Sequence, residues 1–395
     1  MPPSADERWK RLPCVAALLA LLVFAVSANL LAAVQMRAAA ELGVSVQKLA
    51  GVFALQFGGF VLATIIGGMA ADHFGKQRIF LVACAVCAVG GGLWALTPNY
   101  AGAVVGAVLL GMGGGIIESM STALLADLFP ARRRLFLNLS QVAFCVGAVG
   151  GPAVVGWLLP LGVSWRVFYA GVGLLMAGLF VLFALATIPR PAHEERLQVA
   201  VLRELGGRFR FWLPTLVIFL YVLAETAIPL YGNYYLRTFR DAPESWAIYS
   251  IALFWLAMMI GRLSCAFVPE RIAYTPLLCG LLVGAGVAMA ASAWLASWPL
   301  TLVAFALTGL CCSGTWPMAI ALTTTLNPRY SGTVVGVTVA IGALGCVAAP
   351  PLLTGLFALL PPQYVFPTVA GSFGLAALLV LSLRPAERRA AAAEQ

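Results

Sequence analysis

The chain has 395 residues, of which 62% are hydrophobic and 10% are charged, and its formal net charge is +9. Soluble domains carry about 25% charged residues, so this composition excludes a soluble protein and indicates a polytopic membrane protein. The longest hydrophilic stretch, residues 189–210, is too short to fold by itself.

A helix needs about 20 mainly apolar residues to cross the hydrocarbon core of a bilayer. By this rule the sequence predicts an all-α membrane protein with twelve transmembrane helices. The spans are expected near residues 13–36, 46–70, 79–97, 101–126, 136–160, 165–188, 212–235, 246–268, 275–296, 298–325, 331–357 and 364–384.

The distribution of basic residues predicts the orientation of these spans, because cytoplasmic loops carry an excess of Lys and Arg. With both termini in the cytoplasm, most of the 24 Lys and Arg residues fall on the inner side. We therefore expect a multi-pass protein of the inner, or plasma, membrane. The positive charge is spread over many short loops, so it indicates contact with anionic lipid headgroups and no binding of nucleic acid.

The first two spans each contain one amide side chain, Asn29 and Gln56. An amide both donates and accepts hydrogen bonds, so it suits a sugar hydroxyl as well as a neighbouring helix. Substrate contact and a hydrogen bond between helices are therefore both open for these two residues.

The turn after the second span contains Asp72, Gly75, Lys76 and Arg78, preceded by Gly67. Glycine permits a tight turn between two spans. This pattern resembles the motif between helices 2 and 3 of the major facilitator superfamily. The resemblance implies twelve helices in two halves, and a gating role for Asp72, Gly75 and Arg78, which would latch the halves in the outward-facing state.

The fourth span contains a glycine-rich stretch that begins at Gly111 and ends at Glu118, and the fifth begins with Asn138 and Gln141. Ala107, Gly111, Gly114 and Glu118 recur at helical spacing and are expected to share one face, a stripe of small residues that lets a neighbouring helix come close. Gln141 lies one turn further from the inner surface than Asn138, so it is the better candidate for substrate contact.

Residues 189–211 divide the spans into two sets of six, which predicts an N-terminal half, 1–188, a cytoplasmic linker and a C-terminal half, 212–395. Apolar residues recur every four positions from Leu197 to Leu205. That spacing predicts a short amphipathic helix on the inner surface.

The seventh span contains Tyr221 and Glu225, four residues apart and therefore on one helix face. Glu225 lies near the middle of the span, where carriers of this kind place their substrates. Further along, Tyr231, Tyr234 and Tyr235 are expected to form an aromatic belt at the outer membrane interface.

Two tryptophans, Trp255 in the eighth span and Trp316 in the tenth, suit stacking on the apolar face of a sugar ring, although packing alone is also open. Arg262 lies near the inner end of the eighth span, which favours a gating or structural role. No Lys or Arg lies near the centre of a span, which argues against an anionic substrate.

Glu118 and Glu225 stand apart because every other acidic residue falls in a predicted loop, helix end or tail. A charged side chain at the bilayer centre costs about 2.5–3.5 kcal/mol on insertion scales. The favoured interpretation is that both glutamates bind substrate or a proton. The alternative is a protonated or hydrogen-bonded packing residue.

Several of these stretches resemble the fucose/glucose/galactose permease family within the superfamily. They are the glycine-rich stretch ending at Glu118, the start of the fifth span, the pattern from Tyr221 to Glu225, the pattern from Phe254 to Leu263 and the Trp316-Pro317 pair. The resemblance implies transport of a monosaccharide by alternating access, with no catalytic residue, no cofactor and no metal.

The sequence also departs from this family in two places. Fucose permease has a proton-linked aspartate shortly after the residue that matches Asn29, and here Ala32 takes its place. If protons are coupled, Glu118 or Glu225 must carry them, and sodium coupling or uncoupled transport stays open. The spacing from Gly147 to Gly156 partly resembles a motif of drug/proton antiporters.

The prediction is therefore a monomeric secondary carrier for a small neutral solute, most simply a monosaccharide, with H⁺ or Na⁺ as the coupling ion if there is one. The alternatives are a proton-coupled exporter of cationic or amphipathic compounds and a non-transporting sensor on the same scaffold. An enzyme is disfavoured because no nucleophile–base pair or metal-ligand cluster is visible.

Overall fold

A computed structural model describes residues 9–188, 207, 209–265, 273–326 and 331–393 of the chain. Within these ranges twelve helical segments are long and apolar enough to cross a membrane. The predicted amphipathic helix from Leu197 to Leu205, and most of the predicted linker, lie outside the described residues.

The chain divides into two compact units, the first made of residues 1–194 and 244–252 and the second of residues 195–243 and 253–395. The first unit contains six long helices. They are α1 (Arg11–Glu41), α2 (Val46–Phe74), α3 (Lys76–Leu96), α4 (Tyr100–Leu128), α5 (Arg133–Leu158) and α6 (Trp165–Leu185).

The remaining helices begin after residue 207, and α9 contributes its first residues to the first unit and the rest to the second. They are α8 (Phe209–Phe239), α9 (Glu244–Cys265), α10 (Tyr274–Ala291), α11 (Trp298–Cys312), α12 (Thr315–Leu326), α13 (Ser331–Leu359) and α14 (Val365–Ala393). Short 3₁₀ turns precede α5 and α14.

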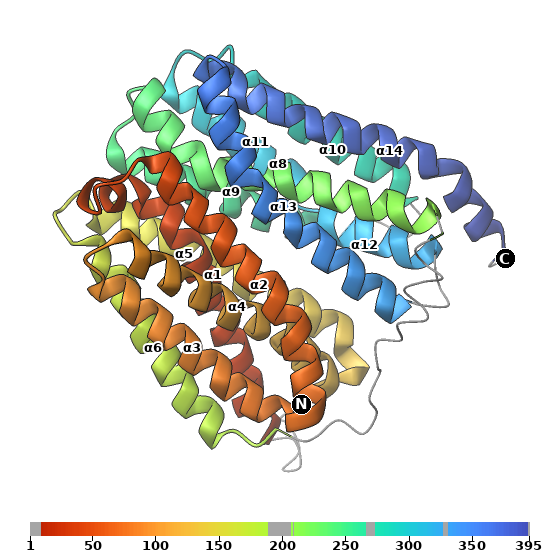
Figure 1. Ribbon diagram of the computed structural model, residues 1–395. Coiled ribbons are helices and arrows are strands. Elements are labelled where there is room, and N and C mark those ends of the chain that lie inside the picture. Colours follow the sequence, from red (N-terminus) through yellow and green to blue (C-terminus); the bar gives the residue numbers. More distant parts are fainter. Residues whose placement is uncertain (1–8, 189–206, 208, 266–272, 327–330, 394–395) are drawn as a thin grey trace. The chain divides into compact units, whose positions relative to one another are not determined.

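The first unit is built on α4, which packs against both α2 and α3, while α1 packs against α5 and α3 against α6 (Figure 1). Aromatic stacking joins α3 to α6: the ring centroids of Phe80 and Phe183 are 4.3 Å apart, and those of Trp94 and Tyr169 are 4.5 Å apart. Helices suit this setting because lipid supplies no hydrogen-bond partners, so the backbone must satisfy its own.

The second unit is built on α8, which packs against α13 and α14, while α10 runs beside α14 (Figure 1). Tyr231 and Tyr235 of α8 are fully buried. The predicted outer aromatic belt is therefore wrong for these two tyrosines, because α8 lies inside the unit and its tyrosines pack against Phe357 and Phe366.

One predicted span differs from a simple helix. Residues 298–325 were expected to form a single helix, but α11 ends at Cys312 and α12 begins at Thr315. The physical reason is Pro317, which has no N–H for the carbonyl of Ser313 and whose ring clashes with that carbonyl.

Candidate functional site

The interior of the second unit contains a hydrogen-bonded pair from α8. The hydroxyl of Tyr221 donates to Oε1 of Glu225 at 2.6 Å, and the same hydroxyl lies 3.2 Å from the backbone oxygen of Cys312. Tyr221 is buried and Glu225 is partly buried. The predicted face shared by Tyr221 and Glu225 is thus real, and it meets the end of α11.

The backbone oxygen of Cys312 needs such a donor because α11 stops there. The last carbonyls of a helix have no partner within the helix, and in a membrane interior they must find another donor. Beyond the break, the side chain of Thr315 is fully buried, and its Oγ1 has no hydrogen-bond partner within the part of the chain that the structure describes. The break therefore exposes backbone and side-chain polar groups inside the unit.

A cationic side chain from α9 belongs to the same cluster. Gly261 allows α9 to approach the break so closely that a Cβ there would lie 2.8 Å from the oxygen of Leu310 and 2.6 Å from Cβ of Ser313. The next residue, Arg262, interacts electrostatically with both Glu225 and Tyr221. The sequence placed Arg262 near a helix end and missed its proximity to Glu225, because that proximity depends on how α9 crosses α11.

The two candidate tryptophans have packing partners in the second unit. Trp255 lies edge-to-face with Phe254 at a centroid distance of 5.6 Å, and it is only partly buried. The ring of Trp316 lies against Gly342 of α13, where an added Cβ would come within 3.2 Å of it. For Trp316 the contact with α13 is a packing role, and sugar stacking by either tryptophan stays a prediction.

In the first unit, the glycines before Glu118 let three helices approach α4. A Cβ at Gly111 would overlap the backbone oxygen of Gln56 in α2, and one at Gly114 would overlap the ring of Phe24 in α1. Glu118 itself is partly buried on the same face as these two glycines. The predicted stripe of small residues is therefore a site of close helix approach.

The amides of the first unit differ in their surroundings. Asn29 is buried, and its side-chain N–H donates to the oxygen of Ala25, one turn earlier, at 2.9 Å. Gln56 is also buried, and among the described residues its Nε2 has no hydrogen-bond partner. Gln141 is partly buried and Asn138 is exposed, and substrate contact by either residue stays a prediction.

The turn between α2 and α3 has the geometry that its sequence predicts at Gly75, whose φ of 87° is one that other residues rarely adopt. The side chain of Asp72 lies outside the described part, and Arg78 is exposed. Lys76 of the same motif, for which no gating role was predicted, is buried and forms an ion pair with Asp127 at the end of α4. Gln77 donates to the oxygen of Ala186 at 2.7 Å.

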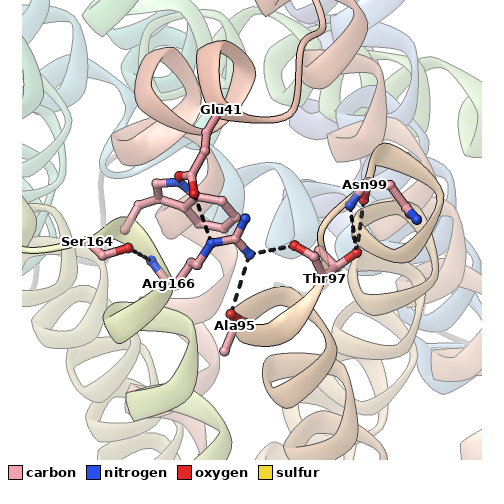
Figure 2. Close-up of polar contacts among 7 residues, drawn as sticks. Glu41, Ala95, Thr97, Asn99, Ser164 and Arg166 are labelled. Atoms are coloured by element: carbon pink, nitrogen blue, oxygen red, sulfur yellow. Dashed lines mark hydrogen bonds and ion pairs between the residues drawn. The ribbon is translucent and has the colours of Figure 1, made fainter.

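A second polar cluster ties together the other ends of α1, α3 and α6 (Figure 2). Arg166 donates to Glu41 at 3.1 Å and to the backbone oxygens of Ala95 and Thr97. Because these acceptors are helix-end carbonyls and a carboxylate, the guanidinium satisfies groups that would otherwise lack a donor. Because the cluster holds together the ends of three helices of the unit, we interpret it as structural.

An ion pair of similar kind joins α1 to the first residue of α9. Nε and Nη2 of Arg37 lie 2.8 Å and 2.7 Å from the two carboxylate oxygens of Glu244. The guanidinium and carboxylate therefore meet in the two-pronged geometry that gives such pairs their strength. Half of the Arg37 side chain is exposed, which reduces its contribution to stability.

Comparison with known proteins defines the class. The family model of the Major Facilitator Superfamily matches residues 16–297, well over half of the chain. The chain therefore belongs to this superfamily of membrane transporters, which are not enzymes. Among the described residues no group of three or more His, Cys, Asp or Glu is placed to hold a metal ion.

Curated relatives include both sugar carriers and drug exporters. The Multidrug resistance protein B homolog of Mycobacterium tuberculosis (strain CDC 1551 / Oshkosh) is 32% identical over 138 residues, which cover 34% of this chain and 25% of that protein. The match thus spans about a quarter of that relative. The glucose/mannose transporter GlcP of Bacillus subtilis (strain 168) is 22% identical over 305 residues, covering 73% of this chain and 74% of that protein.

Solved structures agree on the fold. The nucleoside transporter NupG superposes with a TM-score of 0.80 at 12% identity, covering 94% of this chain and all of that chain. A D-xylose–proton symporter superposes with a TM-score of 0.72 at 14% identity, covering 93% of this chain and 96% of that one. The twelve-helix all-α fold predicted from the sequence is confirmed by these similarities and by the helices themselves.

Proposed function

We propose that this protein is a secondary carrier that moves a small neutral solute of the monosaccharide class by alternating access, as a monomer in the plasma membrane. Glu225 is the group that carries the coupling proton. The observation that carries this proposal is the Tyr221–Glu225 pair at the break between α11 and α12. Ionisable residues inside membrane helices mark substrate and ion pathways, and broken helices mark binding sites in transporters.

The substrate class rests on two further observations. The similarity to the glucose/mannose transporter GlcP extends over nearly three quarters of both chains, whereas the similarity to the multidrug resistance homologue covers a quarter of that protein. A sugar presents many hydroxyls, which suit acceptors such as the carboxylates of Glu118 and Glu225 and amides such as Gln56 and Gln141. The unpartnered Nε2 of Gln56 is a donor that a sugar oxygen would satisfy.

The charge at the cluster also bears on the substrate. Arg262 and Glu225 are opposite charges that interact electrostatically, so the cluster has little net charge when both are ionised. This favours a neutral solute over a cationic drug at Glu225, because Arg262 would repel a cation there. The proximity of Arg262 to Glu225 also removes the sequence-based argument against an anionic substrate, which was that no Lys or Arg lies near the centre of a span.

A second candidate function is the export of cationic or amphipathic compounds. It is favoured by the 32% identity to the multidrug resistance homologue, which is higher than the identity to the sugar transporter although it extends over fewer residues. In that case Glu118 and Glu225 are the candidate cation-binding carboxylates.

Uptake measurements distinguish these functions. Purified protein in proteoliposomes is given radiolabelled hexoses and deoxyhexoses under an inward proton gradient, an inward sodium gradient or no gradient, with protein-free vesicles as the control. We expect gradient-driven accumulation of at least one hexose, stopped by a protonophore. Absence of any hexose uptake or competition, together with extrusion of cationic dyes, would overturn the sugar proposal in favour of export.

A further inference from the structure

We infer that Tyr221 is a switch. Its single hydroxyl hydrogen goes to Glu225 when Glu225 is ionised, and to the backbone oxygen at the break between α11 and α12 when Glu225 is protonated. The inference rests on the proposed function, in which Glu225 carries the coupling proton, and it adds the route by which that proton moves a helix. Tyr221 acts here as a positioning residue, because its hydroxyl works through Glu225 and the end of α11.

The first step is a count of hydrogens. The hydroxyl of Tyr221 lies within hydrogen-bond distance of two acceptors, Oε1 of Glu225 at 2.6 Å and the backbone oxygen of Cys312 at 3.2 Å. A phenol has one hydrogen to donate, and an ionised carboxylate only accepts. When Glu225 is ionised, the hydrogen of Tyr221 goes to the carboxylate, because hydrogen bonds to charged groups are the stronger ones.

Protonation reverses this choice. A protonated Glu225 has an O–H of its own, which can donate to the oxygen of Tyr221. The hydrogen of Tyr221 is then released to the backbone oxygen of Cys312. One proton is taken up by Glu225, no other covalent bond is made or broken, and the last carbonyl of α11 gains a full donor.

The second step is the position of this carbonyl, which lies at the break between α11 and α12. The break at residues 313–314 leaves the end of α11 and the start of α12 without the hydrogen bonds of a continuous helix. The amide of Ser313 donates to the oxygen of Leu310 at 3.3 Å, which is a tightened last turn, and the oxygen of Cys312 lies 3.2 Å from the hydroxyl of Tyr221. A donor that comes and goes at this oxygen therefore changes how firmly the end of α11 is held.

The surrounding groups set the direction of the switch. Arg262 of α9 interacts electrostatically with both Glu225 and Tyr221, and its charge is opposite to that of an ionised Glu225. From α11 the Cys312 thiol interacts with Glu225, and Cys311 interacts with Cys312. On α13 the Cys346 thiol lies 3.5 Å from the hydroxyl of Thr226. From α14 the ring of Phe373 faces Tyr221. Within the described residues, Arg262 is thus the charged group that balances the negative charge of Glu225 once the proton has left.

The test follows the break between α11 and α12 directly and uses the full chain in lipid nanodiscs. Infrared difference spectra over a pH titration report the protonated carboxyl of Glu225, assigned by its loss in Glu225→Gln. Amide hydrogen exchange of residues 312–316 is followed in parallel, and each rate is divided by the intrinsic rate of an unprotected amide at the same pH, because intrinsic exchange itself changes with pH. Exchange below means this ratio. We expect exchange at the break to slow as Glu225 becomes protonated, and we expect Tyr221→Phe to abolish this pH dependence and to shift the carboxyl band.

A matched control exists on the same helix. Tyr231 of α8 is fully buried, and its hydroxyl pairs with Thr354 of α13 at 2.7 Å, so Tyr231→Phe removes an equivalent buried hydroxyl elsewhere. The control variant should keep both the carboxyl band and the pH-dependent exchange. Folding of each variant is checked by its unfolding temperature, and both phenylalanine variants keep the aromatic ring.

The outcomes separate the switch from the carrier. Exchange at the break that does not change with pH in the wild-type protein, or that keeps its pH dependence in Tyr221→Phe, overturns the switch. An equal loss of this pH dependence in Tyr231→Phe also overturns the switch, because any buried hydroxyl would then have the same effect. A working switch in a protein that accumulates no hexose supports the inference and refutes the substrate class. Hexose uptake with a pH-independent break refutes the switch and leaves the carrier standing.

Discussion

At the scale of single residues, Glu225 shows how a carboxylate is tolerated inside a membrane helix. A charge at the bilayer centre costs about 2.5–3.5 kcal/mol on insertion scales. Glu225 meets this cost with a hydrogen bond from Tyr221 and the opposite charge of Arg262. Packing alone does not require any of these three polar groups, since apolar residues of similar size stabilise a core as well or better.

Replacing the carboxylate tests whether Glu225 acts in transport. Glu225→Gln keeps the shape and a hydrogen-bonding oxygen for Tyr221 but removes the ionisable group. We expect membrane insertion and yield to be unchanged, gradient-driven uptake to fall to the level set by the solute gradient alone, and exchange of solute across the membrane to persist. Uptake in proteoliposomes with and without a proton gradient measures this. Wild-type rates and coupling in the variant would show that Glu225 is structural.

The sequence predicted this residue well because polarity inside an apolar span is a local signal. Spacing by four residues was also enough to place Tyr221 beside Glu225. The contribution of Arg262 was missed because it depends on the crossing of α9 and α11, which Gly261 permits. The pair of Lys76 with Asp127 was missed for a similar reason. The two residues are 51 positions apart in the chain, and they meet only through the packing of α3 against α4.

At the scale of helices, α4 depends on glycines for its contacts. A Cβ at Gly111 would overlap the backbone oxygen of Gln56, and backbone cannot move aside as a side chain can. We expect Gly111→Ala to destabilise the protein by about 1–3 kcal/mol, the usual effect of overpacking. The unfolding temperature of the purified variant is the measurement.

Gly58 of α2 is the matched control for that substitution, because a Cβ there meets nothing within 4 Å. Alanine favours helix over glycine by about 1 kcal/mol, so Gly58→Ala should leave stability unchanged or raise it. Equal unfolding temperatures for Gly111→Ala and Gly58→Ala would show that the close approach of α2 and α4 is not required.

The break between α11 and α12 is the feature of this unit that hydropathy could not reveal, since both sides are equally apolar. Gly314 and Pro317 were the local signals for it. Pro317→Ala restores the missing N–H, so we expect a continuous helix, a gain of up to about 3 kcal/mol in stability and a slower turnover. Thermal unfolding and initial uptake rates measure the two effects. A variant that is more stable and yet transports at the wild-type rate would show that the break has no part in transport.

At the scale of the whole molecule, the twelve spans were predictable because each must be apolar over its full length. How polar residues from different helices meet was not, since hydropathy carries no information about which helices are neighbours. The substrate is likewise undetermined by the fold, because a D-xylose–proton symporter and a nucleoside transporter share it.

A ligand screen by thermal shift addresses the substrate at this scale. A solute that binds the folded protein and not the unfolded chain stabilises it by mass action, by about 2.7 kcal/mol at a concentration one hundred times its dissociation constant. We expect a subset of hexoses or deoxyhexoses to raise the unfolding temperature in proportion to the logarithm of concentration. The same solutes should give a smaller shift with Glu225→Gln, since that variant lacks a carboxylate acceptor. Stabilisation by cationic amphiphiles and by no sugar would contradict the monosaccharide proposal, and equal shifts in both proteins would place the solute away from Glu225.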